Sequence, residues 1–189
     1  MDLENTIQAM QNLGGKVVKE GKAILKKKKK TTRPNTLYKD FDYEVQASDT
    51  AVTITFDFGK ASDYWMFVDE GVKGSGSSGG RSKTTGQFMR GQGSPFKFRK
   101  KNVKRGVIAQ WIKNKPAKLR GKGGKFIEKT KANIKSAAFV IGRAIAQRGL
   151  ERTQFFTRPF TQELNNQMDL ILDAFGDDLE KQLELIIGK

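Results

Sequence analysis

The chain has 189 residues, of which 37% are hydrophobic and 30% are charged, and its formal net charge is +16. It contains neither cysteine nor histidine, which excludes disulfides, zinc sites built on Cys or His, cysteine nucleophiles and catalytic triads with a histidine base. A charge of this size predicts anionic partners, which are either nucleic acid or the acidic surfaces of other subunits.

The N-terminus lacks the basic-then-apolar pattern of a signal peptide, and the longest apolar run, Ala137 to Ile141, is too short to cross a bilayer. We therefore expect a soluble protein that is made in the cytoplasm and has no membrane contact.

The charge is unevenly distributed along the chain. From Gly71 to Lys131 there are 18 Lys or Arg and one acid, Glu128, whereas from Thr161 to Lys189 there are seven acids and two lysines. A basic middle and an acidic end predict a protein that contacts copies of itself, or its neighbours, head to tail.

Residues 2–30 have the apolar spacing of an amphipathic helix. Two adjacent glycines, Gly14 and Gly15, predict a kink or a division into two short helices. Five lysines end this segment at 26–30, and they are interpreted either as a solvated helix end or as a phosphate contact.

Residues 40–58 alternate between apolar and polar side chains on both sides of Ser48, Asp49 and Thr50. This pattern predicts a β-hairpin with one buried face and one solvated face. The aromatic stretch 63–71 follows and predicts a helical turn or two that packs against the hairpin.

Residues 71–94 contain eight glycines and no acid, which predicts a long flexible basic loop. Beyond it we expect a short strand at 96–99, helices at 103–113 and 127–149, a glycine–lysine loop at 121–124, an aromatic turn at 154–160 and a long amphipathic C-terminal helix from Thr161.

These elements predict an α+β fold in which a small antiparallel sheet packs against helices. The chain is interpreted as a single domain, residues 1–189. Its four segments would be an N-terminal helical arm, the hairpin with the aromatic stretch, the basic loop region and the C-terminal helices, at 1–33, 34–70, 71–126 and 127–189.

No motif predicts catalysis. The glycines at 74 and 79 have Walker A spacing, but Gly80 and Arg81 follow instead of Lys and Ser/Thr. Asp57, Asp69 and Glu70 could in principle serve a metal-dependent nuclease, but adjacent carboxylates on a helix diverge. We therefore expect a non-enzymatic protein without cofactor or metal.

Aromatic residues also occur among the basic residues of the central segment: Phe88, Phe96, Phe98 and Trp111. Interleaved aromatic and basic residues are typical of single-strand binding platforms. The spacing of Phe96, Phe98 and Trp111 favours core packing over base stacking.

The order of these features resembles the tail-component family of tailed bacteriophages, also called neck, tail-completion or head–tail joining proteins. Two short motifs carry the resemblance, Tyr64 to Gly71 and Phe155 to Phe160. The first has Asp69-Glu70 where the family usually has an acid and an aromatic, and the second has Phe160 where alanine is usual. The segment 72–126 is longer than is typical of the family.

The resemblance implies packing roles for the motif residues, which are Tyr64, Trp65, Phe67, Glu70, Gly71, Phe155, Phe156, Arg158, Pro159 and Phe160. It also implies a homo-oligomeric ring of six or twelve copies in the neck of the virion. The ring would contact portal or adaptor and tail proteins, and double-stranded DNA would pass through it without sequence-specific recognition.

The basic residues expected to face DNA or a partner are Lys73, Arg81, Lys83, Arg90, Lys97, Lys100, Lys101, Lys104 and Arg105. The alternative from another class is a nucleic-acid-binding protein without sequence specificity, either ribosome-associated or accessory to DNA packaging.

Overall fold

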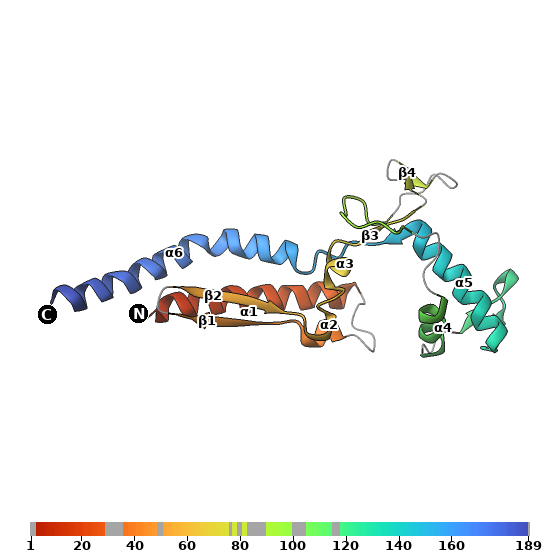
Figure 1. Ribbon diagram of the computed structural model, residues 1–189, viewed down its shortest axis with the longest axis horizontal. Helices are drawn as coiled ribbons and strands as arrows, with labels where there is room; N and C mark the ends of the chain where they lie inside the picture. Colours follow the sequence, from red (N-terminus) through yellow and green to blue (C-terminus); the bar gives the residue numbers. More distant parts are fainter. Residues whose placement is uncertain are drawn as a thin grey trace. The chain divides into compact units, whose positions relative to one another are not determined.

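The computed structural model describes residues 3–28, 36–48, 51–75, 77–78, 81–82, 90–99, 105–114 and 118–188. The chain forms two compact units, of which unit 1 comprises Met1–Asp69 and Thr153–Lys189 and unit 2 comprises Glu70–Arg152. Unit 2 is therefore an insertion within unit 1. Helices and small antiparallel sheets occur together, which confirms the α+β fold class (Figure 1).

Unit 1 contains two long helices and one hairpin, joined by short elements. In chain order these are α1 (Glu4–Lys27), α2 (Thr36–Asp40), β1 (Asp42–Ala47), β2 (Val52–Asp57), η1 (Gly59–Ala61), α3 (Trp65–Asp69) and α6 (Thr157–Ile187).

The hairpin has the predicted alternation. Tyr43 pairs with Phe56 and Val45 with Ile54, so the apolar side chains of both strands share one face. That face is partly buried, while the intervening polar residues, such as Glu44, are exposed. The prediction of a hairpin within residues 40–58 is thus confirmed.

Helix α1 is continuous through Gly14 and Gly15, so the predicted kink or division is wrong. A Cβ atom on Gly14 would lie 2.2 Å from Cδ2 of Tyr43. Gly14 therefore serves close packing of the helix on the hairpin, and the rest of the helix absorbs its unfavourable propensity.

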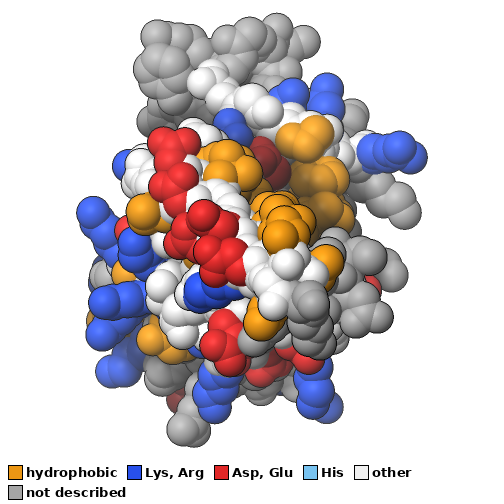
Figure 2. All heavy atoms as spheres, turned by 90° about the vertical axis from the view of Figure 1, so that its left-hand side faces the viewer, with side chains coloured by type: hydrophobic (Ala, Val, Ile, Leu, Met, Phe, Trp, Pro, Cys, Tyr) orange, Lys and Arg blue, Asp and Glu red, His pale blue; other side chains and the backbone are white. Residues whose placement is uncertain are grey.

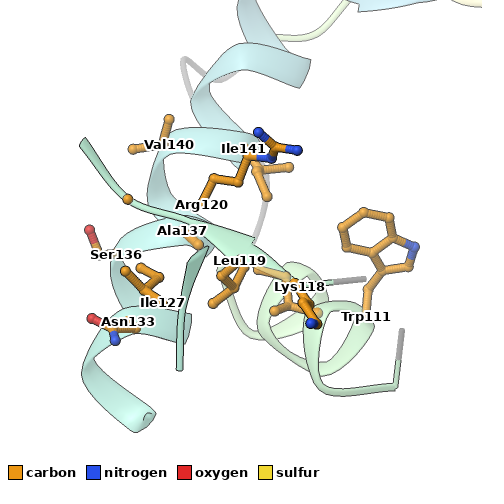
Figure 3. A pocket seen from close by; sticks show the side chains of 12 residues that line it. Trp111, Lys118, Leu119, Arg120, Ile127, Asn133, Ser136, Ala137, Val140 and Ile141 are labelled. Atoms are coloured by element: carbon orange, nitrogen blue, oxygen red, sulfur yellow. The ribbon is translucent and has the colours of Figure 1, made fainter. Parts of the chain in front are cut away.

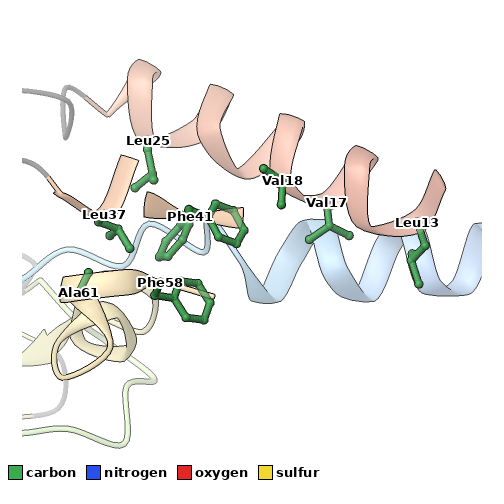
Figure 4. Close-up of a cluster of buried hydrophobic side chains, with 9 residues drawn as sticks. Leu13, Val17, Val18, Leu25, Leu37, Phe41, Phe58 and Ala61 are labelled. Atoms are coloured by element: carbon green, nitrogen blue, oxygen red, sulfur yellow. The ribbon is translucent and has the colours of Figure 1, made fainter. Parts of the chain in front are cut away.

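An aromatic cluster fills the core of unit 1 (Figure 4). The Phe41 ring stacks on Phe58 at 5.2 Å and meets Phe155 edge-on at 5.5 Å, and Phe58 stacks on Trp65 at 4.2 Å. Leu13, Val17 and other apolar residues of α1 close the same core. Aromatic rings in such offset and edge-to-face arrangements dominate core energetics.

Helix α6 runs beside α1 in the opposite direction and continues past the first turn of α1 (Figure 1). Gly176 lies inside α6 and does not interrupt it. The helix begins at Thr157, four residues before the predicted start, and Pro159 lies in its first turn, where proline is tolerated.

The described part of unit 2 contains two packed helices and several two-residue strands. In chain order they are β3 (Val72–Lys73), β4 (Ser77–Ser78), β5 (Arg81–Ser82), α4 (Arg105–Asn114), β6 (Leu119–Arg120), η2 (Lys122–Gly124), β7 (Phe126–Ile127), α5 (Lys131–Arg148) and β8 (Gly149–Leu150). The predicted glycine–lysine loop is the turn η2 between β6 and β7, and Lys97 forms only an isolated bridge to Lys73.

Helices α4 and α5 enclose a small core of Ile108, Ile112, Ile134 and Ala138. Lys129 Nζ donates to the Ile112 carbonyl oxygen at 3.1 Å, where a cation suits the C-terminal end of α4. Thr130 Oγ1 accepts a hydrogen bond from Asn133 N and so caps α5.

Candidate functional site

The two units differ sharply in charge. Unit 2 contains 22 Lys and Arg and three Asp and Glu, a net charge of +19, whereas unit 1 contains 14 and 17, a net charge of −3. The positive charge of the whole chain therefore resides in the inserted unit. The predicted division between a basic middle and an acidic end thus coincides with a structural boundary.

The basic residues that were expected to face DNA or a partner differ in their exposure and in the elements to which they belong. Arg90 and Lys97 are exposed, and Lys73 is partly buried in β3. Arg81 lies in β5 and Arg105 begins α4. The other four, Lys83, Lys100, Lys101 and Lys104, lie outside the described residues.

The two ends of the predicted flexible loop are held by backbone hydrogen bonds. Ser75 N donates to Ala146 O at 2.8 Å, Arg90 N donates to Arg148 O at 3.0 Å, and Lys73 N donates to Phe96 O at 2.8 Å. Residues 71–75 and 90–94 are thus joined to the rest of unit 2 by these hydrogen bonds. The part of the loop from 83 to 89 lies outside the described residues.

Glycine makes this close approach of three chain segments feasible. Gly149 has φ of +84°, and a Cβ atom there would lie 2.3 Å from Val72 O and 2.8 Å from Arg90 O. The glycine-rich composition of residues 71–94 by itself suggests disorder. At this crossing, however, glycine permits the backbone segments to pack closely.

Unit 2 contains a pocket of about 590 Å³ between α5, the end of α4 and the β6–β7 hairpin (Figure 3). Its walls are mostly apolar, and Lys118 and Arg120 contribute cationic groups. The lining residues are Trp111, Ile112, Lys118, Leu119, Arg120, Gly121, Ile127, Asn133, Ser136, Ala137, Val140 and Ile141.

Two cations lie over an aromatic ring next to this pocket. The Phe126 ring centroid is 4.7 Å from Arg120 Cζ and 5.4 Å from Lys118 Nζ. Trp111 is 47% exposed, so the prediction that its spacing reflects core packing is wrong for this residue. Phe96 and Phe98 are partly buried.

The family motif residues have several different roles. Trp65, Phe155 and Phe156 pack in the aromatic core of unit 1, as predicted, and Phe160 stacks on Phe156 at 5.5 Å. Pro159 is buried in the first turn of α6.

Tyr64 and Phe67 are 37% and 39% exposed, and Arg158 is also exposed, so these three residues are outside the buried core. In the short helix α3, Trp65 and Val68 pack against the core three residues apart, and Phe67 lies on another side of the helix.

The adjacent carboxylates of the first motif diverge. Asp69 is buried and accepts hydrogen bonds from Phe156 N at 2.9 Å and from Thr157 Oγ1, so it caps α6 from another part of the chain. Glu70 forms an ion pair with Arg152 at 2.7 Å, which joins the two ends of unit 2. Gly71 has φ of +69° and is buried.

A second buried aspartate caps α1 in the same way. Asp178 of α6 accepts hydrogen bonds from Thr6 N at 2.8 Å, Thr6 Oγ1 at 2.7 Å and Asn5 N at 3.3 Å. Burial raises the pKa of Asp178, but these hydrogen bonds and the nearby Lys181 outweigh burial and hold the pKa below its ordinary value. The partners of Asp178 lie more than 170 residues away in the chain, so the local sequence pattern does not reveal this capping role.

The carboxylates considered for a nuclease have separate partners. Asp57 accepts a hydrogen bond from Gly59 N, while Asp69 and Glu70 have the partners given above. In the part of the chain that the structure describes, no group of three or more acidic side chains is placed to hold a metal ion. Nor is any described helix long and apolar enough to cross a membrane.

Helix α6 has an exposed apolar stripe from Met168 onward. Met168, Leu172, Phe175 and Leu183 are exposed at steps of three, four and eight residues, and Leu185, Ile186 and Ile187 extend the apolar surface to the end of the helix. On the side where α6 ends in Figure 1, hydrophobic and acidic side chains lie next to one another (Figure 2). A stripe of this kind is typical of a protein–protein contact.

These features define an α+β protein with an inserted, strongly basic unit. Comparison with protein-family models gave no match, and neither the curated proteins nor the solved structures gave a significant one.

Proposed function

We propose that the chain is a structural protein of a tailed-bacteriophage virion, a ring subunit of the head-to-tail connector that surrounds the DNA channel. The observation that carries the proposal is the separation of charge, +19 in unit 2 and −3 in unit 1. A conduit for DNA needs cations on the surface that faces phosphates, and an assembling ring needs other surfaces for its neighbours.

The described basic residues suit contact without sequence recognition. Arg90, Lys97 and Arg99 are exposed, so their side chains can contact phosphate oxygens, which carry no sequence information. In this proposal the ring contains six or twelve copies, and it contacts portal or adaptor and tail proteins on either side. The protein would be made in the host cytoplasm and retained in the neck of the virion.

An alternative from another class has support in the same unit. Trp111 is exposed, and Phe126 lies beneath two cations, which is the combination found on platforms that stack single-stranded bases. The alternative is a nucleic-acid-binding protein without sequence specificity, either ribosome-associated or a DNA-packaging accessory.

Electron microscopy and native mass spectrometry of the purified chain separate the two functions. Rings of six or twelve copies, or rings formed only on a portal complex, support the connector. Monomers that bind nucleic acid tightly, with an affinity that falls steeply with salt, support the alternative and contradict the connector. Portal, capsid or tail genes beside this gene would agree with the connector, whereas ribosomal or metabolic genes would not.

A change in the basic loop tests the proposal in particles. The residues at 76–89 would be replaced by a short Gly-Ser linker, which spares Ser75, Arg90 and the crossing at Gly149. We expect a folded protein that no longer completes particles. Replacing Lys19 and Lys60 of unit 1 by Gln is the control, and full infectious particles from the loop variant would contradict the proposal.

A further inference from the structure

The end of α6 and the pocket of unit 2 are complementary in apolar surface and in charge. We propose that the last turns of α6 in one copy of the chain dock into the unit 2 pocket of a second copy. The inference rests on the proposed function, in which copies contact one another, and it names the surfaces that join them.

Helix α6 is longer than the helix it packs against. Asp178 caps the first turn of α1, and α6 then continues to Ile187, about 14 Å further at 1.5 Å per residue. Leu185 lies seven residues after Asp178, on the same side of the helix, and is 69% exposed. The packing face of α6 therefore extends beyond α1.

The extension has the pattern of a helix that binds in a groove. Leu179, Leu183 and Ile186 recur at i, i+4 and i+7, the spacing of the anchors in helix-in-groove recognition. Leu183 is 56% exposed and Ile186 is 71% exposed. Helical turns without packing partners are marginal in water, so a docked state would stabilise this end of α6.

The pocket of unit 2 can receive such anchors. Its volume of about 590 Å³ is comparable to that of ligand-binding clefts, and Leu119, Ile127, Ala137, Val140 and Ile141 give it apolar walls. Val140 and Ile127 are exposed, which leaves an apolar surface uncovered within a unit whose remaining surface is strongly cationic. Figure 3 shows the side chains of α5 and of the β6–β7 hairpin that line the pocket.

Charge favours the same pairing and sets its direction. The end of α6 carries the exposed acids Asp177, Glu180 and Glu184 against one lysine, Lys181, and its last turn contains no basic residue. The negative end of the helix dipole is thus available to the cations of the pocket, Lys118 and Arg120. Because these charges are opposite, they favour a docked helix whose C-terminal end points toward Lys118 and Arg120 over a helix docked in the opposite direction.

The contact joins two different surfaces, so it is heterologous. Repeated contacts of this kind close into a ring when the rotation between copies permits, and otherwise they form a filament. A closed ring agrees with the proposed connector.

Matched substitutions test both surfaces by sedimentation of the full chain over a range of concentrations. Leu183→Ser should weaken self-association by about tenfold or more, because an anchor side chain loses its burial. Leu170→Ser is the control, since Leu170 is 62% exposed and lies outside the stripe. Ala137→Phe should fill the pocket and weaken association similarly, whereas Ala132→Phe, on the same helix but outside the pocket, should not.

Because the chain has no cysteine, introduced cysteines test the contact directly. A copy with Ile186→Cys, mixed with a differently tagged copy with Val140→Cys, should give a disulfide-linked heterodimer on oxidation. Leu170→Cys paired with Val140→Cys should not. A chain with both Ile186→Cys and Val140→Cys that cross-links only as a monomer would overturn docking between copies.

These experiments distinguish failure of the docking contact from failure of the proposed connector function. Rings that persist in Leu183→Ser and in Ala137→Phe overturn this inference and leave the connector standing. Association that depends on both surfaces, in a protein that neither forms rings nor binds DNA, supports the inference and contradicts the connector. A chain that remains monomeric at all concentrations and gives no cross-link overturns the docking contact.

Discussion

Unit 1 and unit 2 are stabilised in different ways. Unit 1 has a net charge of −3 and a core of stacked aromatic rings, with Phe41 and Phe155 fully buried. Unit 2 has a net charge of +19, and its described core contains four small or β-branched residues. Repulsion among like charges opposes compaction, so the unit with the smaller core also has the larger electrostatic cost.

The difference indicates a division of roles. In the proposed function, α6 of unit 1 and the pocket of unit 2 would form the contacts between subunits, and the basic surface of unit 2 would contact a polyanion that reduces its repulsion. The two ends of the insertion are held together by the Glu70–Arg152 ion pair and by the pairing of β3 with β8. The charge can therefore vary in unit 2 without a change in the aromatic core of unit 1.

Removing an aromatic ring from the core of unit 1 should give the largest effect. Phe155→Ala should lower the free energy of unfolding by about 3–5 kcal/mol, because the ring is fully buried and touches Phe41 and Phe58. Hydrogen exchange followed by mass spectrometry should show faster exchange in α1, the β1–β2 hairpin and α6, with α4 and α5 unchanged.

Ile112→Ala in unit 2 is the reciprocal variant. It should raise exchange in α4 and α5 and leave the hairpin of unit 1 protected. Loss of protection in both units with either variant would show that they unfold together, which would contradict their separate stabilisation.

Neutralising exposed cations of unit 2 should give the next largest effect. In the double variant Lys97→Gln with Arg99→Gln, the logarithm of the binding constant for duplex DNA should fall less steeply with the logarithm of the salt concentration. The slope should decrease in magnitude by up to about 2, because each cation that pairs with a phosphate accounts for about one unit of slope. The weakening should be equal on DNA duplexes of unrelated sequence. Lys19→Gln with Lys60→Gln in unit 1 should leave the slope unchanged, and an equal reduction there would contradict the assignment of DNA contact to unit 2.

The adjacent glycines of α1 test how tightly unit 1 is packed. Gly14→Ala should destabilise the protein by about 1–2 kcal/mol. The steric cost of placing a Cβ atom against Tyr43 should exceed the free energy that alanine contributes through its higher helix propensity. Gly15→Ala should stabilise by up to about 1 kcal/mol, since its Cβ would lie 3.5 Å from Tyr43 Oη. Denaturant titration measures both, and changes of the same sign would contradict the packing of α1 on the hairpin.

The smallest effect concerns acid stability, and it should be confined to unit 1. The pKa of Asp178 is below its ordinary value of 3.8 in the folded state, so its stabilisation is complete above pH 3.8 and is lost as pH falls through the lowered pKa. Asp178→Asn should flatten the dependence of unfolding free energy on pH in this range. Asp173→Asn, at an exposed position on α6, is the control and should retain the wild-type slope.

Much of the secondary structure follows from local patterns. The alternation of Tyr43 and Val45 with Glu44 predicts the hairpin and its buried face, because neighbouring side chains of a strand point to opposite sides. The cap at Thr130 and the glycine at 149 fit the start and end of α5. The density of lysine and arginine between 71 and 131 predicts the cationic surface without any knowledge of the fold.

Other features depend on partners that are distant in the chain, so only the tertiary structure decided them. Gly14 is a weak point in a helix until Tyr43 is placed against it, and the capping roles of Asp69 and Asp178 cannot be recognised until the helix ends are placed beside them. The pocket of unit 2 likewise depends on where the β6–β7 hairpin lies beside α4 and α5. The end of α6 is exposed because α6 extends beyond α1. Sequence periodicity determines which face of an element is apolar, whereas burial depends on whether another element covers that face.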